Sequence, residues 1–117
     1  SVMGPESQNL LSKLTPDDLS NEAFPFGNAQ EIEIGYARAL ALRMTYVGEL
    51  GWEIYAPTEF AQDIYDKILS AGTEHGLKLA GMHALNSLRL EKAFRHWGHD
   101  IVDEDTPLEA GLGFAVK

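Results

Sequence analysis

The fold is decided by one stretch of sequence, Thr45-Tyr46-Val47-Gly48-Glu49-Leu50-Gly51-Trp52-Glu53-Ile54-Tyr55, in which two glycines separate two strand-like segments. Before it, side chains alternate in the period-two pattern of a strand with one buried face: Leu40, Leu42, Met44 and Tyr46 against Ala41, Arg43 and Thr45. After it, Trp52 and Ile54 share one face of a strand, and Glu53 and Tyr55 share the other. Gly48 and Gly51 can adopt the positive φ values of a tight connection between antiparallel strands. The stretch therefore predicts a β-hairpin that holds Glu53 on a rigid element.

Glu53 is the one side chain of this stretch with an evident chemical use. A carboxylate fixed on a strand can accept two parallel hydrogen bonds from a planar edge that carries adjacent N–H donors. Arginine side chains and pterin rings both present such an edge. The other interpretation is that Glu53 is a solvated residue on the outer face of the sheet, and spacing alone favours it. Glu49 is interpreted as a turn residue in water.

Composition excludes several classes of partner. The 117 residues suffice for one domain, and a hydrophobic content of 44% is enough for an ordinary core. Nine Lys and Arg stand against 18 Asp and Glu, a net charge of −9 without a basic cluster, so nucleic-acid binding is not expected. No stretch approaches the roughly 18 apolar residues of a membrane span, so no membrane partner is expected. We expect a cytoplasmic protein, or a mitochondrial matrix protein in a eukaryote.

Metal and redox sites find little support. Cysteine is absent, which excludes disulfides and thiolate ligands. The segment His96-Trp97-Gly98-His99-Asp100 holds imidazoles and a carboxylate, but three ligands on one short glycine-containing stretch make a poor cage. We interpret these residues as packing and hydrogen-bonding groups, and we expect no metal site.

The remaining patterns predict an α+β domain, an antiparallel sheet with helices packed on it. Ile32 and Ile34 alternate with glutamates, and after a turn at Gly35-Tyr36 the alternation resumes from Arg38 to Tyr46. Val2 to Pro5 is interpreted as the end of a strand that runs into a helix. The predicted helices are about Pro5–Lys13, a single turn opening at Thr15-Pro16-Asp17-Asp18, a helix from Pro57 that ends at Gly72 or Gly76, and Met82–Arg95. The last is apolar around much of its circumference, so it is expected to be central and buried on more than one side.

Five segments, taken in order, carry a family resemblance: Met3-Gly4-Pro5-Glu6-Ser7 with Leu11 and Leu14; Asp18-Leu19-Ser20 to Phe24-Pro25-Phe26; Tyr46 to Glu53; Ala80-Gly81 with Ser87-Leu88-Arg89-Leu90-Glu91-Lys92; and Thr106-Pro107-Leu108-Glu109-Ala110-Gly111-Leu112. The chain resembles the folate-binding domain of the glycine-cleavage T-protein (aminomethyltransferase) family, including relatives fused to dimethylglycine and sarcosine dehydrogenases. Residues 1–117 would then be a fragment of a single folate-binding, aminomethyltransferase-like domain.

The resemblance implies a site and a reaction. Glu53 matches the family's pterin-binding glutamate, and we place Glu53, Tyr55 and Arg89 in the expected folate site. The family transfers a one-carbon unit from an aminomethyl or iminium donor to tetrahydrofolate. Its catalytic aspartate lies upstream of the matching segment, so this chain is expected to contain no catalytic residue and to be inactive alone. The expected partners are folate and the rest of the parent chain.

Two departures from the family pattern bear on the details. The family often carries Arg-Asp before Ser-Leu-Arg, and that arginine contacts folate; Leu85 and Asn86 stand here, which implies a weak or incomplete tetrahydrofolate site. Arg89 matches the second arginine of the motif, which is either a folate contact or a structural residue that ties the helix to neighbouring backbone. The segment Glu91 to Trp97 is closer to the dehydrogenase-fused relatives, in which FAD binds another domain. A stand-alone T-protein and a non-catalytic folate-fold binding or assembly module remain the alternatives.

Overall fold

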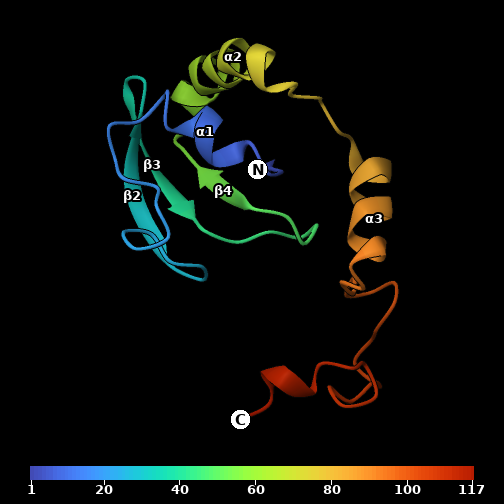
Figure 1. The fold of residues 1–117 in the computed structure, drawn as a ribbon. Helices are drawn as coiled ribbons and strands as arrows, with labels where there is room; N and C mark the ends of the chain where they lie inside the picture. The colour runs from blue at the N-terminus through green and yellow to red at the C-terminus, as the bar shows by residue number, and fades with distance from the viewer.

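A computed structural model describes residues 1–117. It contains one antiparallel sheet in the order β1-β4-β3-β2, with helices α1 and α2 packed on one face (Figure 1). The strands are β1 Val2–Met3, β2 Ala29–Ile34, β3 Ala37–Leu42 and β4 Gly51–Tyr55. The helices are α1 Ser7–Leu11, α2 Ala61–Gly72 and α3 Met82–Glu91, with short 3₁₀ turns η1 Thr58–Phe60, η2 Thr73–His75 and η3 Gly113–Ala115. The predicted α+β class is confirmed.

The sheet separates an inner face from an outer one. The core lies between the inner face and α1 with α2, and its largest fully buried side chains are Trp52, Phe24, Leu10, Leu11, Leu19, Ile32 and Ile34. Leu42 pairs with Glu53 and Leu40 with Tyr55 in the register of β3 with β4. Since paired residues share a face, Glu53 and Tyr55 lie outside while Trp52 lies inside, as the alternation predicts.

The strand β3 has the expected single buried face, but that face is the alanine face. Ala39 and Ala41 are 1% and 0% exposed, whereas Leu40 is 43% exposed and Met44 is 38% exposed. Alternation defines two faces of a strand without deciding which one the helices cover. The neighbours supply the bulk here, because Ile32 pairs with Ala39 and Ile34 with Ala37, so large side chains pack beside small ones. Hydrophobicity alone would have predicted that the leucine side chains of β3, and not the alanines, are buried.

The connection between β3 and β4 is longer than the predicted tight hairpin. The strand ends at Leu42, so residues 43–50 form a loop that reaches toward α3 (Figure 1). Gly48 has the expected positive φ of 68°. Gly51 does not adopt a positive φ and is instead needed for close approach, since a Cβ there would lie 2.8 Å from Met3 Cγ and 3.0 Å from the Val2 carbonyl oxygen. The glycine therefore allows β1 to pair with β4.

Gly51→Ala is expected to lower the free energy of unfolding by on the order of 1–2 kcal/mol, because the added methyl must push the β1 backbone away. Urea unfolding followed by circular dichroism would measure the change. Gly81→Ala is the matched control, since Gly81 has a negative φ and a Cβ added there would meet no atom within 4 Å. Equal stability of the two variants would contradict this account of Gly51.

The helix predictions hold in part. The helix opening near Pro57 is confirmed as η1 and α2, followed by η2 and a left-handed Gly76. The first helix is confirmed but is shorter than predicted, Ser7–Leu11. The predicted helical turn at Thr15 is wrong, because the Thr15 hydroxyl accepts a hydrogen bond from the Asp17 backbone N–H at 3.2 Å and donates to the Asp17 carboxylate at 3.0 Å, which closes a local turn instead.

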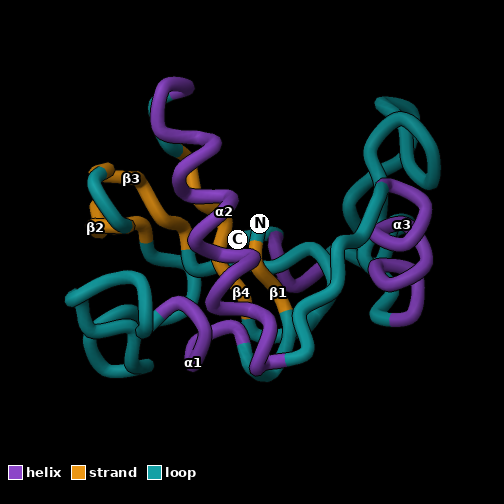
Figure 2. Tube along the Cα trace, turned by 90° about the horizontal axis from the view of Figure 1, so that it is seen from above, coloured by secondary structure: helices purple, strands orange, loops and turns teal.

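Helix α3 is neither as long nor as central as predicted. It ends at Glu91, and Leu88 and Leu90 are 41% and 54% exposed. Figures 1 and 2 show α3 and the turns after it as an arm apart from the sheet, and the molecule measures 45 × 30 × 27 Å. The arm meets the rest through the 43–50 loop: the Tyr46 and Phe94 rings lie 6.0 Å apart, and the Tyr46 hydroxyl donates to the Arg95 carbonyl at 2.7 Å.

Candidate functional site

Glu53 lies on the outer face of β4, a strand with a paired neighbour on each side. Glu53 pairs with Leu42 of β3, and the preceding residue, Trp52, pairs with Val2 of β1. The Trp52 side chain is fully buried and fixes which way the strand faces. Glu53 itself is half-buried on the opposite side. The backbone under the carboxylate is therefore rigid, as the sequence predicts.

The Glu53 carboxylate has one hydrogen-bond partner within the protein. The hydroxyl of Tyr55, two residues along the same strand, donates to Glu53 Oε2 at 2.7 Å. The hydrogen bond to Glu53, together with the negative charge of that carboxylate, raises the pKa of the Tyr55 phenol above its ordinary value of 10.0. The structure thus brings two of the three expected site residues into direct contact.

Glu53→Gln is expected to return the pKa of the Tyr55 phenol toward 10.0, because the neutral amide no longer opposes formation of the tyrosinate. Alkaline titration of tyrosinate absorbance would measure this shift. The chain has 4 tyrosines, so a Tyr55→Phe protein identifies which step of the titration belongs to Tyr55. Superimposable titrations of wild type and Glu53→Gln would show that the hydrogen bond does not exist in solution.

The surroundings of Glu53 on the outer face are partly apolar. Leu42 is its register partner and Leu40 is the partner of Tyr55, so two leucine side chains stand on the same face. Farther out, Arg38 pairs with Glu31 through an Nη2 to Oε2 distance of 3.2 Å. Around Glu53 the face therefore places a hydrogen-bond-accepting carboxylate beside apolar surface, a combination suited to a flat heterocycle with a donor edge.

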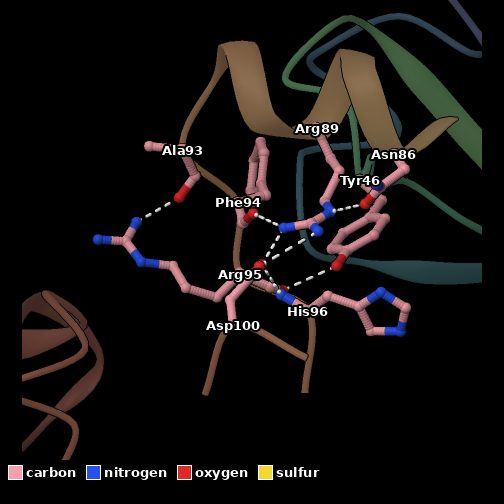
Figure 3. Close-up of polar contacts among 8 residues, drawn as sticks. All are labelled: Tyr46, Asn86, Arg89, Ala93, Phe94, Arg95, His96 and Asp100. Atoms are coloured by element: carbon pink, nitrogen blue, oxygen red, sulfur yellow. Dashed lines mark hydrogen bonds and ion pairs between the residues drawn. The ribbon is translucent and has the colours of Figure 1, made fainter. Parts of the chain in front are cut away.

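Arg89, the third expected site residue, lies in α3 and is not brought to Glu53. Its side chain is 3% exposed, and it forms an ion pair with Asp100 (Figure 3). Its Nη1 also donates to the Phe94 carbonyl at 2.9 Å, and its Nε donates to Asn86 Oδ1 at 2.8 Å. The guanidinium is thus occupied by three groups of its own arm.

Asp100 completes this cluster and was not singled out from the sequence as a partner of Arg89. Its carboxylate also accepts the His96 backbone N–H at 2.8 Å. The hydrogen bond from Arg89, followed by the one from the His96 N–H, holds the pKa of Asp100 below its ordinary value of 3.8. Eleven positions separate Arg89 from Asp100, so no helical or strand spacing could have linked them.

The two histidines of the segment from His96 to Asp100 lie in contact, with their ring planes tilted by 47°. The His96 and His99 ring centroids lie 4.4 Å apart, while Asp100 is already engaged by Arg89. No three His, Asp or Glu side chains are grouped so that they could hold a metal ion.

Two cavities flank α3, and Glu53 lines neither of them. The larger, about 860 Å³, lies among α2, α3 and the segment between them, and only Glu49 and Lys78 of its lining residues are charged. The smaller, about 540 Å³, is lined by Tyr46, Asn86, Arg89 and the two neighbouring histidines, among others. Leu85 lines both. The larger cavity offers apolar surface, and the smaller one is the more polar of the two.

None of the helices has the length and apolar character that crossing a membrane requires.

Comparison with known proteins identifies similar sequences over the whole chain. The profile of the GCVT N-terminal domain matches residues 1–117. The chain is 49% identical over 116 residues to 4-methylaminobutanoate oxidase (formaldehyde-forming) of Paenarthrobacter nicotinovorans, covering 99% of this chain and 14% of that protein. It is 47% identical over 116 residues to mitochondrial dimethylglycine dehydrogenase of Mus musculus, covering 99% of this chain and 13% of that protein. It is 43% identical over 116 residues to an aminomethyltransferase of Caldanaerobacter subterraneus, covering 99% of this chain and 31% of that protein.

Proposed function

Since the chain belongs to the GCVT N-terminal domain family, we propose that it forms part of a folate-binding domain that transfers one-carbon units to tetrahydrofolate. The matched relatives include both an amine dehydrogenase and an aminomethyltransferase. The chain spans 14%, 13% and 31% of the three relatives compared, so the activity of the whole protein is part of the proposal.

The observation that carries the proposal is the placement of Glu53. Its carboxylate stands on a strand paired on both sides, is ionisable, and keeps acceptor positions that the protein does not fill. The pterin ring of folate carries an amino group and an adjacent ring N–H on one edge, which is the donor pattern that a carboxylate accepts in parallel. Leu40 and Leu42 on the same face would lie against the apolar faces of the ring. The donor set and the ring therefore fit.

In the proposed reaction this chain binds and orients folate. Tetrahydrofolate supplies a nucleophilic nitrogen when bound, and no residue of this chain is assigned a proton-transfer role. Glu53 would hold the pterin edge, which fixes the direction in which the heterocycle faces. For Arg89, the engagement with Asp100, Phe94 and Asn86 favours the structural alternative over direct contact with folate.

Among possible parents we propose an amine dehydrogenase-like protein. The identities are 49% to the oxidase and 43–47% to the sarcosine and dimethylglycine dehydrogenases, against 43% to the aminomethyltransferase, and the segment from Glu91 to Trp97 resembles the dehydrogenase-fused relatives. A flavin would then serve amine oxidation in another domain of such a protein, and no FAD site is assigned to these residues.

Calorimetry with folinic acid on the full-length gene product would test the assignment of Glu53. Glu53→Gln is expected to weaken binding by about thirtyfold, or about 2 kcal/mol, because the amide presents its own N–H donors to a donor edge. Glu31→Gln is the matched control: it removes a carboxylate from the same face, where Glu31 is exposed and paired with Arg38. Absence of binding to the wild type would reject the folate proposal, and equal affinities of the two variants would remove Glu53 from the site.

The second candidate is a folate-fold module that binds without catalysis. Leu85 and Asn86 favour it, because neither supplies the guanidinium expected before the Ser87-Leu88-Arg89 segment, and Asn86 is committed to Arg89. Incubating the full-length gene product with tetrahydrofolate and the iminium produced from dimethylglycine or sarcosine separates the two. Formation of methylenetetrahydrofolate above the uncatalysed rate supports the enzyme, whereas tight folinic acid binding without acceleration supports the module.

A further inference from the structure

We propose that Tyr55 is a positioning residue: its hydroxyl holds the Glu53 carboxylate in the orientation in which that carboxylate receives the ligand edge. This inference rests on the proposed folate site and assigns Tyr55 a role through Glu53. Tyr55 thus keeps the place in the expected folate site that was assigned to it from the sequence, with a specific role there.

The geometry of β4 places the two side chains beside each other. Residues two apart on a strand project from the same face, so the two side chains start side by side. The register with β3 fixes both backbone positions, through Leu42 for Glu53 and Leu40 for Tyr55. The hydroxyl oxygen lies 2.7 Å from Glu53 Oε2, a distance typical of a hydrogen bond to an ionised acceptor.

The hydrogen bond leaves Glu53 able to bind a ligand. An ionised carboxylate has about four acceptor positions on its two oxygens, and Tyr55 uses one of them on Oε2. Oε1 is free of any partner within the protein, and a second position on Oε2 remains. Two parallel hydrogen bonds from a planar edge can therefore form while the Tyr55 contact persists.

The hydrogen bond from Tyr55 orders the Glu53 side chain before the ligand binds. A glutamate on an uncovered sheet face otherwise samples several rotamers, and binding would have to select one of them at an entropic cost. Tyrosine has only two side-chain torsions, so it is itself ordered cheaply and can hold a more flexible neighbour. Tyr55 is 54% exposed and has no other hydrogen-bond partner in the protein, so core packing does not account for the direction of its hydroxyl.

A double-mutant cycle on the full-length gene product tests the inference, with folinic acid affinity as the readout. Tyr55→Phe keeps the ring and removes only the hydroxyl, and it is expected to weaken binding about tenfold. In the Glu53→Gln background the same change is expected to have no further effect, because there is no carboxylate left to position. Tyr36→Phe is the matched control, since Tyr36 is an exposed tyrosine whose ring lies over Lys67 and whose hydroxyl makes no hydrogen bond within the protein.

Each outcome of the cycle decides a different point. Strong coupling between the two substitutions, with unchanged thermal stability of Tyr55→Phe, supports positioning. Additive losses would overturn it in favour of direct contact between Tyr55 and folate. Unchanged affinity of Tyr55→Phe, while Glu53→Gln binds weakly, would overturn the inference and leave the proposed function standing. Failure of the wild type to bind folinic acid would reject both.

Discussion

Trp52→Ala is expected to lower the free energy of unfolding by about 3–5 kcal/mol. The Trp52 side chain is fully buried at the centre of the core, where its ring meets Phe24 edge-on with centroids 6.5 Å apart. The Arg43 guanidinium lies 5.2 Å from the Trp52 ring centroid, and its Nη1 donates to the Phe24 carbonyl at 2.7 Å. Truncation would open a cavity and also remove the aromatic surface that shields a buried cation.

Trp52→Phe is the control that separates ring packing from indole chemistry. The Trp52 Nε1–H is buried without a hydrogen-bond acceptor in the protein, so removing that donor carries no hydrogen-bond penalty. The phenylalanine variant is therefore expected to lose less than half as much stability as the alanine variant. Urea unfolding followed by circular dichroism measures both. Equal losses would contradict the account in which aromatic volume at this position stabilises the core.

The position of Glu53 could be predicted from sequence because alternation is a local property. Trp52 and Glu53 are neighbours on one strand, so burial of one side chain places the other outside. The face of β3 that points inward could not be predicted in the same way. It depends on which side of the sheet α1 and α2 cover, and on Ile32 and Ile34 occupying the volume beside the alanines. That is a tertiary property.

The loop of residues 43–50 and the arm formed by α3 and the turns after it also depend on contacts that local sequence patterns do not indicate. Two glycines indicate a turn, but within residues 43–50 Tyr46 contacts the Arg95 carbonyl, far along the chain, and no local pattern indicates that contact. The apolar circumference of α3 predicts burial, yet Leu88 and Leu90 remain exposed: the arm meets the loop through Phe94 and Arg95, which follow α3, and α3 itself does not pack on the sheet. Periodicity describes a surface that could be covered without identifying what covers it.

Arg89→Met is expected to destabilise the arm locally by about 3 kcal/mol, which corresponds to roughly hundredfold faster amide exchange in α3 and the following turns. Methionine preserves length and apolar contact but cannot donate to Asp100, Phe94 or Asn86. Hydrogen exchange measured by mass spectrometry would report the change segment by segment. Arg38→Met is the matched control, because the exposed Arg38–Glu31 pair should contribute little.

The same cluster predicts an acid sensitivity with a definite sign. The folded-state pKa of Asp100 lies below 3.8, so its ion pair contributes stability that is fully present above that pH and is lost as pH falls toward the lowered value. Asp100→Asn is expected to exchange faster than wild type at neutral pH, and the difference should shrink below pH 3.8. A difference that stays constant through this range would contradict the ion pair.

Arg89→Met also separates the two roles that remain for this arginine. If Arg89 has a structural role, Arg89→Met should greatly raise the rate of amide exchange in α3. Folinic acid affinity should then fall only by the amount that the arm contributes to binding. A direct folate contact requires the reverse, a large loss of affinity with α3 exchange unchanged. Because the guanidinium is 3% exposed and already bound to Asp100, direct contact would require that the Asp100 carboxylate first be displaced. If folate displaced Asp100 in this way, folate would protect residues 94–100 from amide exchange in the wild type but not in Arg89→Met. We expect no such protection in either protein.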